Sequence, residues 1–596
     1  MEAAALPAEA GFQLEYQPTI EEFEDLDVGI ELPASADLLL DENPNNIFGP
    51  WAHKQYLDKY SWKDEAGEPT EVWPDTAYRV VRYELGALGY TDRDWEFQRL
   101  VQLITERKLI PGGRKLAQAG RPKHQTNNCF LYRCGDSREA WFEDLLRKCG
   151  MSLSTGGGVG VVYSDVRPYG TRLHSTGGFA TGPLTPANMV NDAARRIMGG
   201  GHRRSAIWAG LHWWHPDIFD WIVEKDWPDY IKEMKKKAAE EGKDQDVMAP
   251  LDMTNISVIL DTEFFEAYDD PGHDRHDLAH EVYWKATAHM VKHGEPGFSI
   301  DCGENEGENL RNACTEITSR DDSDVCNLGS INLARVESIE EFEEIVNLST
   351  LLLLAGTVYS DIPHAEVKFT REKNRRLGLG LMGLHEWMLH RGLRYEMSPE
   401  LRSWLEVYAT STEKACAWAD KHNLSHPIKT RAIAPTGTIG ILGETTTGIE
   451  PLFCVAYKRR FLDTDGVWKY QFVIDPIAQR LIDEGIDPDS IETAYSLSYD
   501  VERRIKFQAE LQEYVDHSMA STINLPYAMT DEQEVKDFGE TLYRYVHRLR
   551  GVTCYPDGTR SGQPLEAVPY DYAKTRTGVT YDDNRDHACA SGVCGI

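Results

Sequence analysis

The sequence predicts an α/β fold that follows a helical segment. From about residue 127 onward, short β-rich runs alternate with helical stretches and clusters of glycine, which is typical of α/β proteins. Between residues 46 and 121, apolar residues instead recur at three- and four-residue spacing, which predicts helices over residues 76–88 and 91–108. We therefore expect a helical N-terminal domain and then a larger α/β domain.

The composition excludes some classes of function. The chain has 596 residues, 41% of them hydrophobic, and 97 acidic against 63 basic residues, for a formal net charge of −34. So acidic a surface argues against non-specific binding to nucleic acid or to anionic membranes. The N-terminus lacks the basic start and long apolar run of a secretory signal, and the most apolar run, residues 348–358, is too short to span a bilayer. We expect a cytoplasmic protein, in the host cytoplasm if the source is viral.

The α/β part contains strands, helices and glycine-rich turns in alternation. Residues 127–134 are predicted to form a strand and residues 141–154 a helix, followed by Gly156-Gly-Gly-Val-Gly160 and a further strand. A second glycine cluster, residues 198–205, follows a predicted helix and carries two arginines. Each cluster is either a plain loop or a place where backbone N–H groups approach an anionic ligand.

Three later segments continue this pattern. Residues 377–384 are apolar and studded with glycine, as in a tightly packed barrel interior. Pro435-Thr-Gly-Thr438 follows a short apolar run and predicts either a phosphate-binding loop or a simple turn. Residues 521–526 and 551–558 have the character of strands and turns.

The segment Asn312-Ala-Cys-Thr-Glu316 has the strongest chemical character. If it is extended, Asn312, Cys314 and Glu316 point the same way, because side chains alternate along a strand. A thiol, a carboxylate and an amide on one face suggest chemistry on adjacent hydroxyl groups. The alternative is a buried cysteine that merely has a glutamate nearby.

Two of the eleven cysteines, Cys589 and Cys594, lie in a polar C-terminal segment, where they are suited to thiol–disulfide exchange. The chain has no Cys-x-x-Cys pair and no His-Glu-x-x-His motif, so we expect no metal site.

Five separated segments resemble the catalytic subunit of ribonucleotide reductases, in that family's order, and the resemblance runs from about residue 46 to the C-terminus. They are Asn128-Cys129, Asn312-x-Cys314-x-Glu316, Cys326-Asn-Leu-Gly, Pro435-Thr-Gly-Thr438 and the pair Cys589 and Cys594. The resemblance implies a ten-stranded α/β barrel of two five-stranded parallel halves, with a finger loop through its centre. The acidic, proline-containing residues before residue 46 predict a flexible arm (1–45). The remaining parts expected are a helical domain (46–121), the barrel (122–575) and a redox tail (576–596).

The same resemblance implies how the site works. Cys314 becomes a thiyl radical that removes the 3′ hydrogen of a ribonucleoside di- or triphosphate, Glu316 accepts the 3′-hydroxyl proton, and Asn312 binds the ribose hydroxyls. Cys129 and Cys326 supply the reducing equivalents and form a disulfide, which needs their Cα atoms within about 7 Å. Cys589 and Cys594 then reduce that disulfide and are themselves reduced by a thioredoxin-like protein. Substrate contacts fall to these residues: Asn128, Pro435, Thr436, Gly437 and Thr438.

An effector site is also implied. A nucleotide such as ATP or a dNTP would contact Asp136, Ser137, Gly200, Arg203 and Arg204. The alternative for Asp136 and Ser137 is a plain helix cap. The other six cysteines match no role in the family, and we interpret them as buried small hydrophobes: Cys134, Cys149, Cys302, Cys416, Cys454 and Cys554.

Several short segments indicate which class of ribonucleotide reductase the chain resembles. The segments Phe48-Gly-Pro, Trp73-Pro-Asp-Thr76, Cys326-Asn-Leu-Gly-Ser-Ile-Asn332 and Tyr555-Pro-Asp-Gly resemble the adenosylcobalamin-dependent class. Glycyl-radical and ATP-cone signatures are absent, and a single Tyr555 stands where partner-dependent members have two tyrosines. One departure is Asn312-Ala-Cys-Thr-Glu316, because many cobalamin-dependent members read Asn-Pro-Cys-Gly-Glu.

Two alternatives stay open. One is a class I-type catalytic subunit that needs a separate metal-containing radical subunit and binds no cofactor itself. The other is a non-catalytic nucleotide-binding regulator. Either a monomer or a homodimer is compatible with the sequence.

Overall fold

The computed structural model describes residues 48–122, 124–174, 176–195, 197–199, 203–240, 246–462, 468–557 and 565–582. The expected acidic arm, Gly200 of the expected effector site and the tail cysteines Cys589 and Cys594 lie outside these residues.

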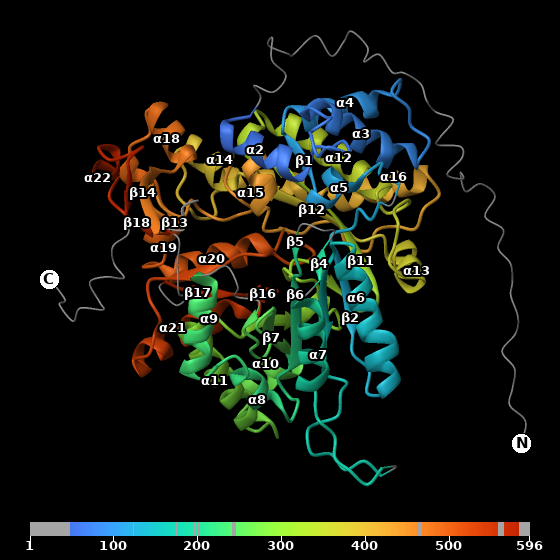
Figure 1. Cartoon of the computed structure of the whole chain (residues 1–596), viewed down its shortest axis with the longest axis vertical. Helices are drawn as coiled ribbons and strands as arrows, with labels where there is room; N and C mark the ends of the chain where they lie inside the picture. Colours follow the sequence, from blue (N-terminus) through green and yellow to red (C-terminus); the bar gives the residue numbers. More distant parts are fainter. Residues whose placement is uncertain are drawn as a thin grey trace, which may run out of the picture. The chain divides into compact units, whose positions relative to one another are not determined.

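The N-terminal segment is helical, as the spacing of its apolar residues predicts. The predicted helices over residues 76–88 and 91–108 correspond to α3 and α4, which pack on each other and on the long helix α12 (Figure 1). Trp73 anchors this packing, since its buried indole Nε1 donates to the carbonyl of Ile104 at 3.1 Å. The elements here are α2 (Pro50–Lys59), α3 (Trp73–Gly86), α4 (Trp95–Thr105), β1 (Leu109–Pro111), α5 (Gly113–Gln118) and, from later in the chain, α12 (Ile339–Ala355).

Five parallel strands follow, in the spatial order in which they occur along the chain. Each strand pairs in parallel with the next, and helices connect them, as expected for an α/β arrangement. The strands are β2 (Cys129–Arg133), β3 (Gly158–Val162), β6 (Ile207–His212), β7 (Thr254–Asp261) and β8 (Gly297–Asp301). The intervening elements are η2 (Ala140–Leu145), α6 (Leu146–Ser154), α7 (Leu184–Arg195), β4 (Met198–Gly199), β5 (Arg203–Arg204), α8 (Ile218–Val223), α9 (Asp229–Glu240), α10 (Thr262–Asp269) and α11 (His276–His293).

A second series of parallel pairings begins at β11, which pairs in parallel with β12, the predicted glycine-studded run. Parallel bridges then join Leu379 to Arg431 and Ile433 to Met519, and β15 pairs in parallel with β17. The two series meet twice in antiparallel fashion, β11 with β2 and β16 with β8. The strands are β11 (Asp324–Asn332), β12 (Leu377–Met382), β15 (Ile523–Leu525), β16 (Gly551–Val552) and β17 (Cys554–Pro556).

Helices α12, α13 and α20 pack on these strands, and the chain also forms a small antiparallel sheet of order β18-β13-β14-β19. The helical elements are η5 (Leu333–Arg335), α13 (Ala365–Asn374), α14 (Leu384–His390), α15 (Pro399–Ala409), α16 (Ser411–Lys421), α17 (Gly437–Gly443), α18 (Pro476–Asp483), η6 (Pro488–Ser490), α19 (Ala494–Leu497), α20 (Val501–Gln512), α21 (Glu532–Val546) and α22 (Tyr570–Lys574). The sheet consists of β13 (Ala456–Leu462), β14 (Trp468–Ile474), β18 (Leu565–Ala567) and β19 (Thr580–Asp582).

One hydrophobic cluster draws on both series of strands. Its members come from β2, β3, β6 and β7, from β11, and from residues 432–434, and they surround Leu310 and Ile317. Leu310 lies just before, and Ile317 at the end of, residues 312–317, which we call the finger loop. The strands β9 (Leu310–Arg311) and β10 (Thr318–Ser319) lie immediately before and after the loop and pair with each other. The short helix η4 (Gly303–Asn305) precedes β9.

The condition that Asn312 to Glu316 is extended is not met. Thr315 has a φ of 67°, and its N–H donates to the carbonyl of Asn312 at 3.0 Å, so the segment is a tight turn. The turn is needed because the chain must reverse for β9 to pair with β10. Strict alternation of side chains therefore does not apply here.

The first glycine cluster has a packing role that neither sequence-based interpretation included. Gly158 and Gly160 lie within β3, directly against the finger loop. A Cβ atom on Gly160 would lie 1.8 Å from the carbonyl oxygen of Arg311, and one on Gly158 would lie 2.8 Å from the Cβ of Ala313. The loop can cross the strand only because these side chains are missing.

Candidate active site

The predicted site residues meet at a cavity of about 340 Å³ beside the finger loop. It brings together residues that are separated by more than 300 positions in the sequence. Eight predicted site residues line it, namely Asn128, Cys129, Cys314, Glu316, Pro435, Thr436, Gly437 and Thr438. The two other predicted catalytic residues, Asn312 and Cys326, are buried directly beside these.

The three predicted side chains of the finger loop differ in their exposure to solvent. Cys314 is exposed, whereas Asn312 and Glu316 are 0% and 1% exposed. The loop's turn therefore gives the three side chains different environments. Asn312 fixes the turn, because its Oδ1 accepts from the N–H of Ile317 at 3.0 Å.

Glu316 has the electrostatic character of a general base. Burial raises its pKa from 4.5 to about 7, although a hydrogen bond from the Asn312 side chain opposes this rise. Its Oε2 is buried and has no hydrogen-bond partner in the structure. A carboxyl group with a pKa near neutrality and an unused oxygen in a ligand-sized cavity is equipped to exchange a proton with a ligand.

Cys129 and Cys326 lie on adjacent antiparallel strands and are direct partners in the register of β2 and β11. Residues opposite each other in an antiparallel pair have Cα atoms about 4.5–5.5 Å apart, within the range that a disulfide requires. Asn312 Nδ2 also lies 3.0 Å from Cys129 Sγ, which connects this pair to the finger loop. Burial raises the pKa of the Cys326 thiol well above its usual value.

The Pro435-Thr-Gly-Thr438 segment forms the opposite wall. Thr436 has a φ of 49° and precedes α17, and its Oγ1 accepts from the N–H of Gly448 at 2.7 Å. The segment is thus a turn, as one interpretation of the sequence proposed, and it also lines the cavity. All four of its residues line the same cavity as Cys314.

The predicted effector residues lie elsewhere. Asp136 accepts from Arg167 Nε at 2.7 Å, and Ser137 Oγ accepts from the N–H of Ala140 at 3.0 Å at the start of η2. Ser137 therefore acts as a helix cap, which is the alternative that the sequence allowed. Arg203 and Arg204 form β5, which pairs with β4 in a short hairpin. The effector role of these residues stays a prediction.

A buried charge cluster beneath the finger loop was missed by sequence reasoning. Arg376 donates to Asp324 at 2.6 Å and to Glu308 at 3.0 Å, and Thr318 Oγ1 donates to Glu308 at 2.7 Å. These contacts hold the loop's base to β11. Charged residues normally indicate a solvated surface, so no local signal in the sequence could have identified this cluster.

Several small or polar lining residues were also missed. Gly112 is the clearest, since a Cβ atom there would lie 2.7 Å from Asn128 Oδ1. The paired glycines 112 and 113 were the available signal. The other lining residues that the sequence analysis did not single out include Tyr60, Leu153, Ser205, Ala206, Leu328 and Ser330.

The remaining cysteines largely agree with their interpretation as small hydrophobes. Cys134, Cys149, Cys302, Cys454 and Cys554 are buried. The exception is Cys416, which is only half-buried on α16, so the interpretation was wrong for this residue.

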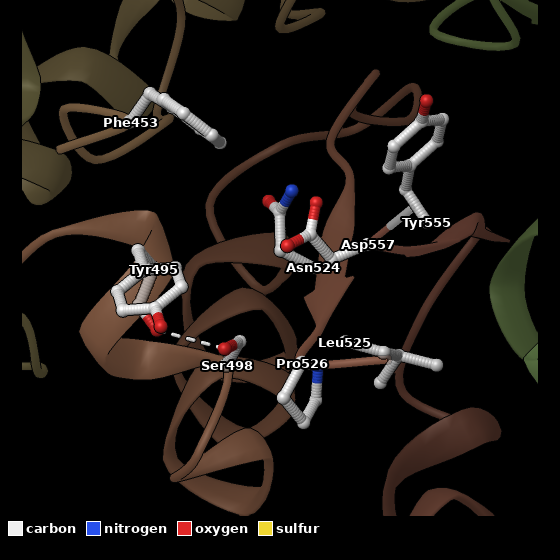
Figure 2. A pocket seen from close by; sticks show the side chains of 8 residues that line it. All are labelled: Phe453, Tyr495, Ser498, Asn524, Leu525, Pro526, Tyr555 and Asp557. Carbon is white, nitrogen blue, oxygen red and sulfur yellow. Dashed lines mark hydrogen bonds between the residues drawn. The ribbon is translucent and has the colours of Figure 1, made fainter. Parts of the chain in front are cut away.

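A second, much smaller hollow lies at the carboxyl ends of β15 and β17 (Figure 2). Its volume of about 30 Å³ suits a water molecule rather than a nucleotide. Tyr555 stands where partner-dependent reductases have two tyrosines, and it lines this hollow. The other lining residues are Phe453, Tyr495, Ser498, Asn524, Leu525, Pro526 and Asp557.

Comparison with known families agrees with this geometry. The family model described as ribonucleotide reductase, barrel domain, matches residues 127–417 and 427–555. The chain therefore belongs to the ribonucleotide reductase family, the enzymes that convert ribonucleotides to 2′-deoxyribonucleotides.

The chain is also similar to individual proteins named as ribonucleotide reductases. The chain is 26% identical over 582 residues to a protein named vitamin B12-dependent ribonucleoside-diphosphate reductase from Mycobacterium tuberculosis, with 86% of this chain and 80% of that protein covered. It is 24% identical over 723 residues to a putative adenosylcobalamin-dependent ribonucleoside-triphosphate reductase from Mycobacterium phage D29, covering 92% and 99%. A ribonucleoside-diphosphate reductase large chain from Cryptosporidium parvum is 25% identical over 390 residues, covering 59% and 48%.

Among the residues that the structure describes, no helix is both long and apolar enough to cross a membrane.

Proposed function

We propose that this chain is an adenosylcobalamin-dependent ribonucleotide reductase acting on ribonucleoside di- or triphosphates. The observation that carries the proposal is the exposed Cys314 in a cavity that also contains Glu316, Cys129 and the Pro435-Thr-Gly-Thr438 segment. Three relatives whose matches cover 86%, 83% and 92% of this chain are named for dependence on vitamin B12 or adenosylcobalamin.

Such a cofactor would place its reactive end beside Cys314. Part of the cavity wall consists of small residues, Gly157, Gly158, Ser205 and Ala206, which leave room next to the exposed thiol. These residues would hold the cofactor's reactive end. When bound, adenosylcobalamin supplies the organic radical that oxidises the Cys314 thiol.

Cys314 then acts on the substrate. As a thiyl radical it removes the 3′ hydrogen of the ribose, and its S–H bond is re-formed in the process. Asn312 keeps the turn in place, and the Thr436 and Thr438 hydroxyls with the adjacent backbone amides bind the substrate phosphates. Asn128, whose buried Oδ1 has no hydrogen-bond partner in the structure, would contact the ribose.

Glu316 accepts the proton of the 3′-hydroxyl, which favours loss of the 2′-hydroxyl as water. The leaving hydroxyl takes a proton from the Cys129 and Cys326 pair. These two thiols together give two electrons and two protons and become a disulfide. The sugar radical then takes its 3′ hydrogen back from the Cys314 thiol, which becomes a thiyl radical again. The net reaction therefore converts one ribonucleotide and two thiols into one deoxyribonucleotide, one disulfide and one water molecule.

We further propose that the two series of strands form one ten-stranded barrel of two five-stranded parallel halves. Support comes from the parallel bridges 379–431 and 433–519, from the antiparallel contacts of β11 with β2 and of β16 with β8, and from the shared interior cluster around the finger loop. The division into an arm (1–45), a helical domain (46–121), a barrel (122–575) and a redox tail (576–596) is part of the same proposal.

The remaining parts of the proposal concern partners. We infer a dNTP or ATP effector at Asp136, Ser137, Gly200, Arg203 and Arg204, a thioredoxin-like reductant, and either a monomer or a homodimer. A cytoplasmic location accords with chemistry that needs reduced thiols.

The test is reduction of a ribonucleotide by the purified chain with dithiothreitol, with and without adenosylcobalamin. We expect deoxyribonucleotide only when the cofactor is added. If the chain stays inactive with the cofactor but becomes active when a separate metal-containing subunit is added, the class I-type alternative is supported. Nucleotide binding with no turnover in either condition would support the regulator.

The tail cysteines provide a separate prediction. Replacing both Cys589 and Cys594 with serine should abolish turnover driven by thioredoxin and its reductase, because the Cys129–Cys326 disulfide would no longer be reduced. Turnover driven by dithiothreitol should persist, since a small dithiol enters the cavity directly. Rates with both reductants are measured in parallel, and an equal loss with the two would contradict the shuttle role.

A further inference from the structure

We propose that Asp226, His289 and His293 form a binding site for a divalent transition-metal ion, outside the active-site cavity. The sequence analysis expected no metal site, because none of the usual motifs is present. The structure brings one carboxylate to a pair of histidines, with one ligand atom of each residue within 4.8 Å of the others.

The two histidines share one face of α11, because they are four residues apart and therefore one helical turn apart. Their ring centroids are 5.6 Å apart. Asp226 lies in the connection between α8 and α9, and its Oδ1 is 3.8 Å from His293 Nε2. The cluster thus joins two separate parts of the chain.

His293 indicates that the arrangement is suited to a ligand. Its Nε2 is buried, yet it has no hydrogen-bond partner in the structure. A buried polar nitrogen without a partner is costly, and a metal ion would satisfy it.

The donor atoms of the three side chains need to move only slightly to reach the separations found around a metal ion. Donor atoms around a tetrahedral zinc ion with bonds of 2.0–2.1 Å lie about 3.3 Å apart. All three side chains are partly exposed, so rotation about their side-chain bonds can bring the donors together. Two imidazoles and one carboxylate favour Zn²⁺, Co²⁺ or Ni²⁺ over Mg²⁺ or Ca²⁺, and a water molecule would complete the coordination.

Nearby cations act against the metal. Lys232 Nζ donates to Asp226 Oδ1 at 3.1 Å, and the charge of Lys292 also reaches this cluster. The Lys232 contact is between two exposed side chains, which is a weak interaction that a divalent ion can displace. Lys225 is occupied elsewhere, since it pairs with Glu295 at 2.7 Å.

A metal at this position would have a structural role. It would tie the α8–α9 connection to the end of α11, close to Glu295 and to the start of β8 at Gly297. None of its three ligands lines the cavity around Cys314. Metal binding should therefore raise the thermal stability of the part of the chain that contains β2 to β8, without supplying a reactive group.

The test is titration of the full chain with Co²⁺, followed by visible absorption and by calorimetry. Absorption distinguishes a nitrogen and oxygen site from any thiolate site, because only the latter gives intense sulfur-to-metal bands. We expect one nitrogen and oxygen site in the unchanged chain. In Asp226→Asn, and in His289→Ala combined with His293→Ala, its affinity should fall at least about tenfold.

Helix α11 supplies a matched control. His276 and His280 have the same four-residue spacing, but their ring nitrogens contact the carbonyls of Ala267 and Tyr268. Replacing both with alanine should leave Co²⁺ binding unchanged. Lys232→Ala should bind Co²⁺ more tightly, a gain that misfolding would not produce. Absence of a nitrogen and oxygen site in the unchanged chain, or its persistence in the His289→Ala and His293→Ala variant, would overturn the proposal.

Discussion

Replacing Cys314 with serine should lower ribonucleotide reduction at least about a thousand-fold, because the hydroxyl group does not replace the thiol as the carrier of the radical. Nucleotide binding should hardly change, since the sulfur and oxygen side chains are similar in size and the cavity walls are untouched. Turnover with dithiothreitol and adenosylcobalamin, together with the substrate dissociation constant, checks both statements.

Cys416→Ser is the matched control, because Cys416 is half-buried on α16 and does not line the cavity. It should retain full turnover. If Cys314→Ser retained full turnover, the proposed chemistry would be wrong. Loss of binding in parallel with turnover would indicate a damaged cavity rather than a missing radical carrier.

Replacing Glu316 with glutamine should lower turnover by about 10² to 10⁴-fold, the usual effect of removing a general base. In the unchanged chain the pKa of Glu316 is about 7, so the group is protonated and inactive as a base at pH 5 to 6. Turnover should therefore rise about tenfold per pH unit below 7 and level off above it. The glutamine variant should lose this inflection, which a pH profile of the rate measures directly.

The same raised pKa has a consequence for stability. Between pH 4.5 and 7 the native protein holds a proton on Glu316 that the unfolded chain releases. This contribution to the free energy of unfolding is fully present below pH 4.5 and is lost as the pH rises through 7.

Glu316→Gln should consequently gain stability relative to the unchanged chain as the pH rises, by up to about 3 kcal/mol at pH 8 compared with pH 4.5. Denaturant unfolding of both proteins at the two pH values gives this difference. An equal difference at both pH values would mean that the carboxyl group is not held in the proposed environment.

The geometry also explains how a radical site and a redox pair can work together. Asn312 belongs to the finger loop and lies 3.0 Å from Cys129 Sγ, while Cys129 faces Cys326 across β2 and β11. The residue that shapes the turn below Cys314 therefore touches the pair that would supply the electrons. Disulfide formation between adjacent strands requires little backbone movement, since the register already aligns the two residues.

Local sequence determined much of this protein. The periodicity of residues 76–88 and 91–108 identified α3 and α4, and alternating apolar runs identified β2, β12 and β15, because these patterns depend on near neighbours in the chain. The chemical types at Asn312, Cys314 and Glu316, read with Cys129 and Cys326, indicated the family. Each of these signals lies within a few residues of sequence.

Only the tertiary structure decided how those residues meet. The sequence left open whether Asn312 to Glu316 is extended, and the pairing of β9 with β10 requires a turn with a positive φ at Thr315. The opposition of Cys129 and Cys326 and the raised pKa of Glu316 depend on strand register and burial, which arise from contacts across hundreds of residues. The cluster of Asp226, His289 and His293 escaped sequence reasoning for the same reason, because a loop and a helix contribute its ligands separately and only packing brings them together.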